Sequence, residues 1–425
     1  MSRVVVVFGL LLSTMLSTPL AAASSPEARQ VYSIVWTVPV VETGPCLLSV
    51  VLPPSEKERC SSWTRREAGG AAFHDGLGVV VVGGSDQLLH GLDGRDGHKL
   101  WEVPTPGAVV AEPTLFDDGA YVGTDDARVL RFDVTSGRKR WETPVDAEVT
   151  EPVVIDGDVI YVVTGADSTY ALNRLTGEAL WVQKHALPRA ITLRGEAKPL
   201  VVDLPAGEGL RSADVQAVGT AQRRLYVGHA DGRLSVLDRE TGAPLMDLNL
   251  SQDDSFGDLD ADPILHVLKG GVRRIIVASQ TRGIFAIDPR TNAEAWHQDE
   301  PGIVRLAGGG EAMIVAAGAG KVLGLDAHTG AIRWRFTWPK GAPTRIVVKG
   351  GRVHLGSDRG AVYVLSLFSG RPLQYAGSGT GTAADLALWQ DMMFVTSTAG
   401  SVTALSNAWV GSIHAKKTLQ DRLRR

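Results

Sequence analysis

The sequence predicts an all-β protein, an eight-bladed β-propeller of four-stranded antiparallel blades that is closed by an N-terminal strand in the last blade. Three observations predict this fold. A phrase of Asp, three residues, Gly, three residues and Trp recurs about every 40 residues. Short alternating apolar segments with glycine-containing turns fill each interval, without a helical period. An unpaired Trp-containing strand lies near the N-terminal end, where no blade precedes it.

Each repeat is expected to form one blade. In order, it consists of a short inner strand, a turn, a strand, a Gly turn, a third strand, an Asp-x-x-Thr-Gly turn and an outer Trp strand. Glycine suits a last turn that needs positive φ, and the Asp side chain can accept backbone N–H groups there. The Asp position of the phrase falls at Asp93, Asp133, Asn173, Asp238, Asp288, Asp326, Ser366 and Ser406.

The two ends of the repeat array predict how the ring closes. The last repeat stops at Ser406 without an outer Trp strand, whereas residues 31–38 form an alternating Trp strand with no blade of its own. We therefore expect residues 31–38 to be the outer strand of the last blade, with Trp36 in the position that Trp101 occupies in the first. This pairing removes two exposed sheet edges and makes residues 24–414 one domain.

The segments outside the propeller carry separate signals. Residues 1–23 combine Arg3, an apolar run and Ala21-Ala22-Ala23, which is the pattern of a cleaved signal peptide. No later stretch is long and apolar enough to predict a transmembrane segment in the mature chain. Export places Cys46 and Cys60 in an oxidising compartment, where they form a disulfide or remain two independent thiols. Residues 415–425 form a basic C-terminal tail, expected to be a solvated end.

Composition and motifs argue against several classes of function. The formal net charge is −4, which excludes the strongly basic footprint of a dedicated nucleic-acid binder. The ten histidines show no metal-ligand spacing, and the Asp258-x-Asp260-x-Asp262 run lacks the Gly and distal Glu of an EF-hand loop. Since no catalytic motif is present either, we predict no catalytic residues, no metal site and no cofactor.

The repeated phrase resembles the PQQ-type propeller repeat over nearly the whole mature chain. Two groups share this repeat, the quinoprotein dehydrogenases and the BamB family of periplasmic scaffolds. The resemblance to the dehydrogenases implies a pair of adjacent cysteines, which this chain lacks. The choice between the groups therefore depends on where the period breaks, between Asn173 and Asp238 and between Asp238 and Asp288. At both breaks, the residues beyond the 40-residue period are expected to lie largely after an outer Trp strand. Connections of this type lie on one face of the ring.

These two breaks contain stretches that are similar to BamB. Residues 187–199 match its partner-binding loop at Leu193, Arg194, Gly195 and Glu196, with Ile191 for its first Leu, and residues 255–263 match a second loop at Asp258, Asp260 and Pro263. The resemblance implies that Ile191, Leu193, Arg194, Glu196, Asp258 and Asp260 lie on one exposed rim and bind a POTRA domain of a BamA-like β-barrel assembly protein. Alternatively, Arg194 pairs with Asp258 or Asp260 within a packed loop.

The resemblance implies a non-enzymatic scaffold in the periplasm, peripheral to the outer membrane, that assists assembly and insertion of outer-membrane β-barrel proteins. Unfolded outer-membrane proteins are a further expected partner. No lipobox cysteine follows residue 23, so membrane attachment is expected through the protein partner, or the protein acts from solution. The alternative is a secreted propeller that binds a small molecule or redox cofactor in its central channel.

Overall fold

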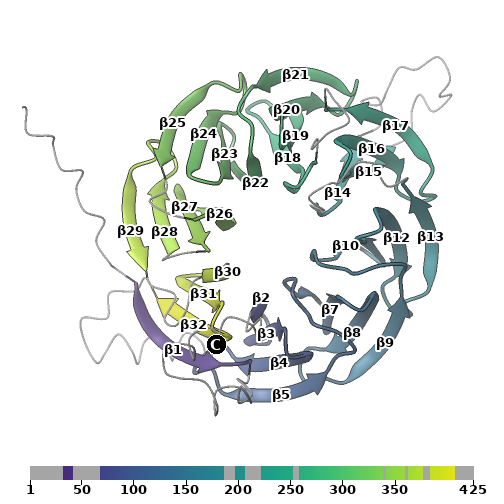
Figure 1. Ribbon diagram of the computed structural model, residues 1–425, viewed down its shortest axis with the longest axis vertical. Coiled ribbons are helices and arrows are strands. Elements are labelled where there is room, and N and C mark those ends of the chain that lie inside the picture. The colour runs from purple at the N-terminus through teal and green to yellow at the C-terminus, as the bar shows by residue number, and fades with distance from the viewer. Residues whose placement is uncertain are drawn as a thin grey trace, which may run out of the picture.

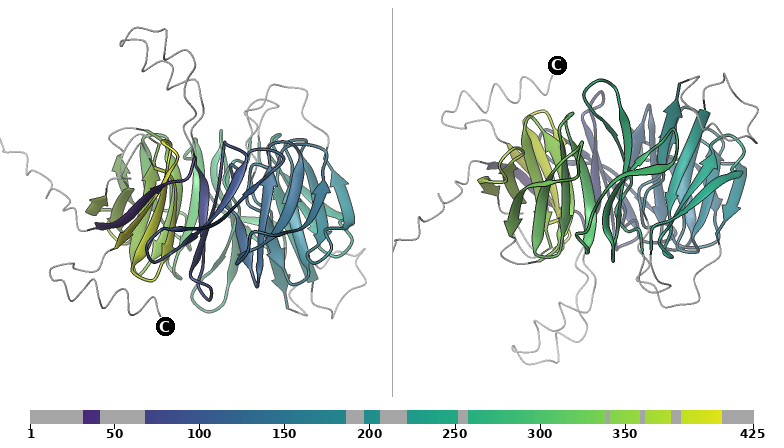
Figure 2. Two further views of the ribbon diagram at one scale, coloured as in Figure 1. Left: turned by 90° about the horizontal axis from the view of Figure 1, so that it is seen from below. Right: turned by 90° about the horizontal axis from the view of Figure 1, so that it is seen from above.

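Eight four-stranded antiparallel sheets are arranged as blades around a common axis, and Figure 1 looks down that axis. The two side views of Figure 2 show that the strands run between the two faces of a flat ring. The predicted eight-bladed β-propeller is therefore confirmed. The computed structural model describes residues 32–41, 68–185, 197–205, 222–251, 258–337, 341–358, 362–376 and 383–406.

Each blade is numbered here by its place in the ring, and its strands follow one another from the axis outward. Blades 1 to 4 comprise β2 (Ala68–His74), β3 (Val79–Gly84), β4 (Leu88–Asp93), β5 (Lys99–Pro104); β6 (Thr114–Phe116), β7 (Gly119–Thr124), β8 (Arg128–Asp133), β9 (Lys139–Pro144); β10 (Val154–Asp156), β11 (Val159–Val163), β12 (Ser168–Asn173), β13 (Ala179–Lys184); β14 (Leu200–Leu204), β15 (Gln222–Gly228), β16 (Arg233–Asp238) and β17 (Pro244–Asn249).

Blades 5 to 7 follow the same order, and blade 8 takes its outer strand from the start of the chain. They comprise β18 (Ile264–Val267), β19 (Arg273–Ser279), β20 (Gly283–Asp288), β21 (Ala293–Gln298); β22 (Ile303–Gly309), β23 (Met313–Gly318), β24 (Lys321–Asp326), β25 (Ile332–Thr337); β26 (Pro343–Lys349), β27 (Arg352–Ser357), β28 (Val362–Ser366), β29 (Pro372–Ala376); β30 (Ala383–Trp389), β31 (Met392–Ser397), β32 (Ser401–Ser406) and β1 (Ser33–Pro39).

The Trp and Gly of the repeated phrase meet between neighbouring blades. Trp101 of blade 1 donates its indole N–H to the carbonyl of Val134 in blade 2, at 2.8 Å. Its ring also lies against Gly137, where a Cβ would come within 2.7 Å of the ring and where φ is 68°. The glycine is thus required for both its conformation and the close approach. The same contact recurs in the pairs Trp36–Gly97, Trp141–Gly177, Trp181–Gly242, Trp296–Gly330 and Trp334–Gly370.

One irregular pair shows that the two positions vary together. Met246 of blade 4 replaces the Trp, and Asn292 of blade 5 replaces the Gly that would face it. Asn292 keeps the left-handed backbone at φ 55°, which asparagine tolerates better than most residues. Its side-chain amide donates to the Met246 sulfur at 3.4 Å and accepts a hydrogen bond from the Tyr226 hydroxyl at 3.2 Å. Polar contacts thus replace the ring packing at this junction.

The Asp of the phrase fixes the turn before the outer strand, as predicted. In blade 6, one carboxylate oxygen of Asp326 accepts the backbone N–H groups of His328 and Thr329 at 3.0 and 2.9 Å. Hydrogen bonds from Arg333 and from this turn hold the pKa of Asp326 at about 2. The carboxylate therefore stays ionised and keeps the turn closed across the neutral pH range.

The N-terminal strand closes the ring. β1 pairs antiparallel with β32 from Ser33↔Ser406 to Pro39↔Ser401, which confirms the predicted outer strand of the last blade (Figure 1). Trp36 lies opposite Ala404, and its indole N–H donates to the carbonyl of Gly94 in blade 1 at 3.2 Å. It therefore makes the same contact with the next blade that Trp101 makes. The sheet edge of β32 is paired along its length.

A second contact joins the closing segment to blade 7. The Tyr32 hydroxyl lies 3.2 Å from Nε2 of His354, and both side chains are buried. Burial lowers the pKa of His354 to about 4, because the protonated imidazole would lose its hydration there. His354 is therefore neutral at physiological pH and packs as part of the core.

Residues 1–23, Cys46, Cys60 and residues 415–425 lie outside the described residues. The signal peptide, the disulfide, the basic tail and the domain limits at 24 and 414 thus stay predictions. Within the described ranges, no helix is long and apolar enough to cross a membrane.

Replacing Trp36 by alanine should lower the free energy of unfolding by about 3–5 kcal/mol, because the cavity opens the contact between blades 8 and 1. Ile34→Ala is the matched control, since Ile34 lies on the same strand but is 55% exposed. It should change stability by no more than about 0.5 kcal/mol. Denaturant unfolding of both variants measures the difference, and equal losses would contradict this account of closure.

Acidification should weaken the fold through His354. Above pH 6.5 the imidazole is neutral in both states, so it does not alter stability. As the pH falls from about 6.5 to about 4, only the unfolded chain takes up the proton, which lowers the free energy of unfolding by up to roughly 3 kcal/mol. His354→Gln should flatten this part of the curve of stability against pH, whereas exposed His328→Gln should leave it unchanged. An unchanged slope in His354→Gln would refute the assignment.

Candidate functional site

The candidate site is the rim of the ring where the two irregular connections lie. One connection runs from β13 to β14 and the other from β17 to β18. Both lead from an outer strand to the next inner strand, and in antiparallel four-stranded blades all connections of this type emerge on one face. The expected location on one face is therefore correct for these two connections.

A direct contact joins the ends of the two connections. The backbone N–H of Lys198 donates to one carboxylate oxygen of Asp262 at 2.8 Å, and its ammonium group lies 2.9 Å from the other. Burial alone would lower the pKa of Lys198, but the Asp262 carboxylate outweighs this effect and raises it. The end of the first connection is thus held by a charged pair to the end of the second.

His229 forms a second link between the same connections. It lies in the turn between β15 and β16, and its ring stacks on that of His185, with centroids 3.9 Å apart. His185 begins the first connection, directly after β13. The carbonyl of His229 accepts the backbone N–H of Leu259 from the second connection, at 3.3 Å. No spacing in the sequence pointed to this contact, because it joins three separate segments.

Only some of the predicted partner-binding residues belong to the described part of the chain. Ile191, Leu193, Arg194 and Glu196 lie outside the described residues. Asp260 is half-buried, and its carboxylate accepts a hydrogen bond from the Gln280 side-chain amide at 2.6 Å. Its other carboxylate oxygen, Oδ1, is buried, so only part of the residue reaches the surface.

Asp258 departs from the prediction. We expected it on an exposed rim, but the structure buries it completely. Its backbone carbonyl accepts the N–H of Gln280 at 3.0 Å, and the next residue, Leu259, packs into the core between blades 4 and 5. This anchoring pulls Asp258 inward, so its carboxylate is not part of the accessible surface.

The first period break also differs from the prediction. We expected most of its extra residues after the outer strand β13. The structure divides them between that connection and residues 205–221, which link β14 to β15. A connection between a first and a second strand emerges on the opposite face of the ring. Only part of this excess therefore belongs to the candidate rim.

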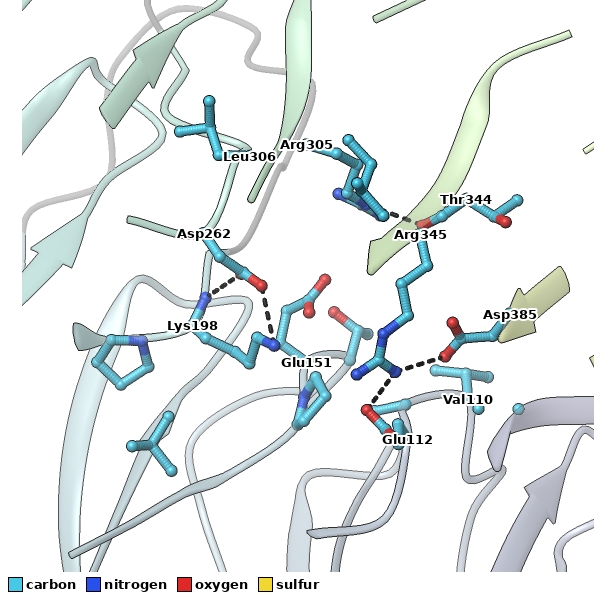
Figure 3. A pocket seen from close by; sticks show the side chains of 18 of the residues that line it. Val110, Glu112, Glu151, Lys198, Asp262, Arg305, Leu306, Thr344, Arg345 and Asp385 are labelled. Carbon is cyan, nitrogen blue, oxygen red and sulfur yellow. Dashed lines mark hydrogen bonds and ion pairs between the residues drawn. The ribbon is translucent and has the colours of Figure 1, made fainter. Parts of the chain in front are cut away.

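The central channel is lined by charged side chains that the sequence analysis did not identify. It encloses a cavity of about 580 Å³, and Figure 3 shows the side chains that converge there. Four of them directly precede a proline, which favours an extended backbone at the start of an inner strand. Such charged residue–proline pairs are the signal that could have located the channel. Seven blades contribute one charged residue each: Glu112, Glu151, Lys198, Asp262, Arg305, Arg345 and Asp385.

Arg345 connects three blades across this channel. Its guanidinium of blade 7 forms ion pairs with Glu112, which precedes β6 of blade 2, and with Asp385 of blade 8, the latter at 3.2 Å (Figure 3). Burial raises the pKa of Glu112, and Arg345 opposes this rise. Gly70 of blade 1 lies directly against Glu112 and Asp385. The three positive charges of the channel offset three of its four negative charges, which supports a role in holding the inner strands together.

Gly70→Ala should destabilise the fold by about 1–3 kcal/mol, because a Cβ there would come within 2.5 Å of Glu112 Cβ and 2.6 Å of the Asp385 carboxylate. Gly76→Ala, in the first turn of the same blade, is the control, since its Cβ would meet nothing closer than 3.6 Å. Thermal or denaturant unfolding compares the two variants. A loss in Gly76→Ala as large as that in Gly70→Ala would argue against close packing around the charged cluster.

Comparison with known proteins gives one curated relative with limited coverage. The outer membrane protein assembly factor BamB of Xanthomonas campestris pv. campestris is 24% identical over 188 residues, which are 42% of this chain and 45% of that protein. The aligned part thus spans less than half of the relative's length.

Solved structures share the fold at low sequence identity. The crystal structure of BamB from Moraxella catarrhalis has a TM-score of 0.65 and 20% identity, covering 81% of this chain and 99% of that one. Quinohemoprotein alcohol dehydrogenase from Comamonas testosteroni has a TM-score of 0.63 and 12% identity, covering 90% and 77%. At these identities the likenesses concern the propeller alone.

The sequence also matches the family described as outer membrane protein assembly factor BamB over residues 33–142, 86–335 and 318–411. These overlapping segments extend from the closing strand to the end of the last described blade. The chain therefore belongs to the BamB family of PQQ-repeat β-propellers.

Proposed function

We propose that this protein is a non-enzymatic scaffold that binds a POTRA domain of a BamA-like protein and assists assembly and insertion of outer-membrane β-barrel proteins. The observation that carries the proposal is the contact of Lys198 with Asp262, which joins the ends of the two BamB-like connections where they reach the central channel. Family membership supplies the class of partner.

The described residues support a preorganised binding surface. Besides the Lys198–Asp262 pair, the stacked rings of His185 and His229 hold the start of the first connection against blade 4. The end of the second connection is held by Leu259, whose side chain is buried and whose N–H bonds to His229. Since the anchors are fixed before a partner arrives, less ordering entropy is lost on binding.

The side chains proposed to contact the partner are Ile191, Leu193, Arg194, Glu196 and Asp260. An arginine among apolar residues is the composition that most often carries binding energy at protein interfaces. Asp260 is a half-buried acidic residue of the second connection. Asp258 is omitted from this set because it is buried.

The cellular setting is part of the same proposal. Residues 1–23 direct export, Cys46 and Cys60 pair in the periplasm, and the partner holds the protein at the outer membrane. Unfolded outer-membrane proteins are a second class of partner. No step of this function uses a cofactor, a nucleic acid or a chemical reaction of the chain.

The double variant Leu193→Ala, Arg194→Ala should weaken binding to the isolated POTRA region at least roughly thirtyfold, since hot-spot residues contribute about 2 kcal/mol or more. Its melting temperature should stay close to that of the parent chain. The matched control is Arg138→Ala, Leu175→Ala, because both residues are exposed in turns between third and fourth strands, on the opposite face. Binding by calorimetry and co-purification from outer-membrane extract measure the effect.

Two outcomes would count against the proposal. Unchanged co-purification of the partner with the double variant would remove the rim as its binding surface. If Arg194 instead pairs with Asp260 inside the chain, the single variant Arg194→Ala should lower the melting temperature and partner binding together.

A further inference from the structure

One cation of the central channel, Arg305 of blade 6, has no ion pair in the described part of the chain. The other two cations of the lining are each paired with a carboxylate. Arg305 instead donates its Nε–H to the carbonyl of Thr344 and an Nη1–H to the carbonyl of Val304, both at 2.9 Å. These carbonyls accept hydrogen bonds but bring no negative charge. Nη2 makes no hydrogen bond within the described residues, so it can donate two N–H groups to an anionic group in the channel.

A carboxylate faces the same cavity from another side. Glu151 belongs to the connection from β9 to β10, at the start of blade 3, and lines the cavity together with Arg305. Figure 3 shows both side chains directed into the cavity, with Arg305 near blade 7 and Glu151 near the Lys198–Asp262 pair. A carboxylate has several lone pairs and accepts more than one hydrogen bond at a time. The channel thus presents opposite charges on two of its sides.

The space between these charges suits a small molecule. The cavity has a volume of about 580 Å³, which is within the usual range of ligand pockets. Blade 1 lines it with Gly69 and Gly70, which have no side chains, and Val110, Ile264 and Leu306 add apolar surface. Apolar walls with a few converging polar groups are typical of ligand sites. The lining lies where the inner strands begin, at the face that carries the candidate rim.

The charge of the lining favours one class of ligand. With every group ionised, three cations and four carboxylates give 3 − 4 = −1. A ligand that is only an anion would add a second uncompensated negative charge. A ligand that is only a cation would leave Arg305 without a counter-charge. A molecule with both charges matches both sides, and charges removed from water need such partners.

We propose that the central channel binds a small zwitterion, an α-amino acid or a short peptide with free ends. Arg305 holds the carboxylate of the ligand and Glu151 holds its ammonium group. The two carbonyl hydrogen bonds fix the Arg305 guanidinium in advance, so little ordering entropy is lost on binding. This inference goes beyond the scaffold function and does not depend on it, since it concerns the isolated chain.

The test titrates the mature chain by calorimetry with glycine, diglycine and triglycine, at about pH 6.5, where both end groups are charged. These probes carry the same two groups at increasing separation, so they distinguish a free amino acid from a peptide. We expect saturable binding of one molecule per chain for at least one probe. Bound ligand should also raise the melting temperature, because the unfolded chain has no such site.

Blocked forms of the best-binding probe test whether both charges are recognised. The N-acetylated form keeps only the carboxylate, and the C-terminal amide keeps only the ammonium group. Each should bind at least roughly tenfold more weakly, because one buried charge of the channel then loses its partner. These measurements use the parent chain and need no variant.

Variants identify the residues that hold the ligand. Arg305→Gln and Glu151→Gln should each weaken binding of the best probe at least roughly tenfold. Arg371→Gln is the matched control, since Arg371 is exposed in the turn between β28 and β29 and does not line the channel. It should bind the probe as the parent chain does.

Several results would overturn the proposal. One is the absence of saturable binding for all three probes, and another is parent-like affinity in Arg305→Gln. Equal affinity for the N-acetylated form would show that the ammonium group is not recognised. If Arg305→Gln does not fold, the blocked probes still decide the question with the parent chain. Partner binding is measured separately, so a failed titration leaves the scaffold proposal untouched.

Discussion

The contact between the tryptophan of one blade and the glycine turn of the next is the interaction on which this ring depends. The indole N–H bonds to a turn carbonyl, and the ring fills the space that a glycine leaves open, as Trp101 does with Val134 and Gly137. Each blade therefore carries a donor surface on one side and an acceptor surface on the other. Repeating one such contact around an axis leads to closure. Between blades 4 and 5, Met246 stands in place of the tryptophan and Asn292 in place of the glycine, and the two side chains contact each other. A change in one blade is thus matched by a change in the next.

Two contacts close the ring, one at its outer edge and one at its central channel. At the outside, β1 pairs with β32 and brings Trp36 to Gly94, so the first and last segments of the array complete a blade together. At the inside, Arg345 links blades 2, 7 and 8 over Gly70. The outer contact is mainly apolar and the inner one electrostatic. Buried His354 beside Tyr32 adds an acid-sensitive contact at the same seam.

The candidate rim uses the rigid ring as a support for irregular segments. Lys198 with Asp262, and His229 with His185 and Leu259, fix the ends of two connections that the repeat itself does not need. Such anchoring favours a binding surface, because ordering its ends costs little when a partner arrives. The same His229 ring is held by Asp167 at 2.7 Å and by Ser235 at 2.9 Å, so this anchor is fixed within blades 3 and 4.

The sequence by itself determined the fold, the number of blades and the closing strand, because these depend on a local period that each repeat carries in full. It also located the irregular connections, since they interrupt that period. Only the tertiary structure decided which side chains face solvent or meet. It buried Asp258, assigned residues 205–221 to the link between β14 and β15, and gathered Arg345 with Glu112 and His185 with His229. Those contacts join residues far apart in the chain, and their geometry depends on the angle between blades, which no spacing along the sequence records.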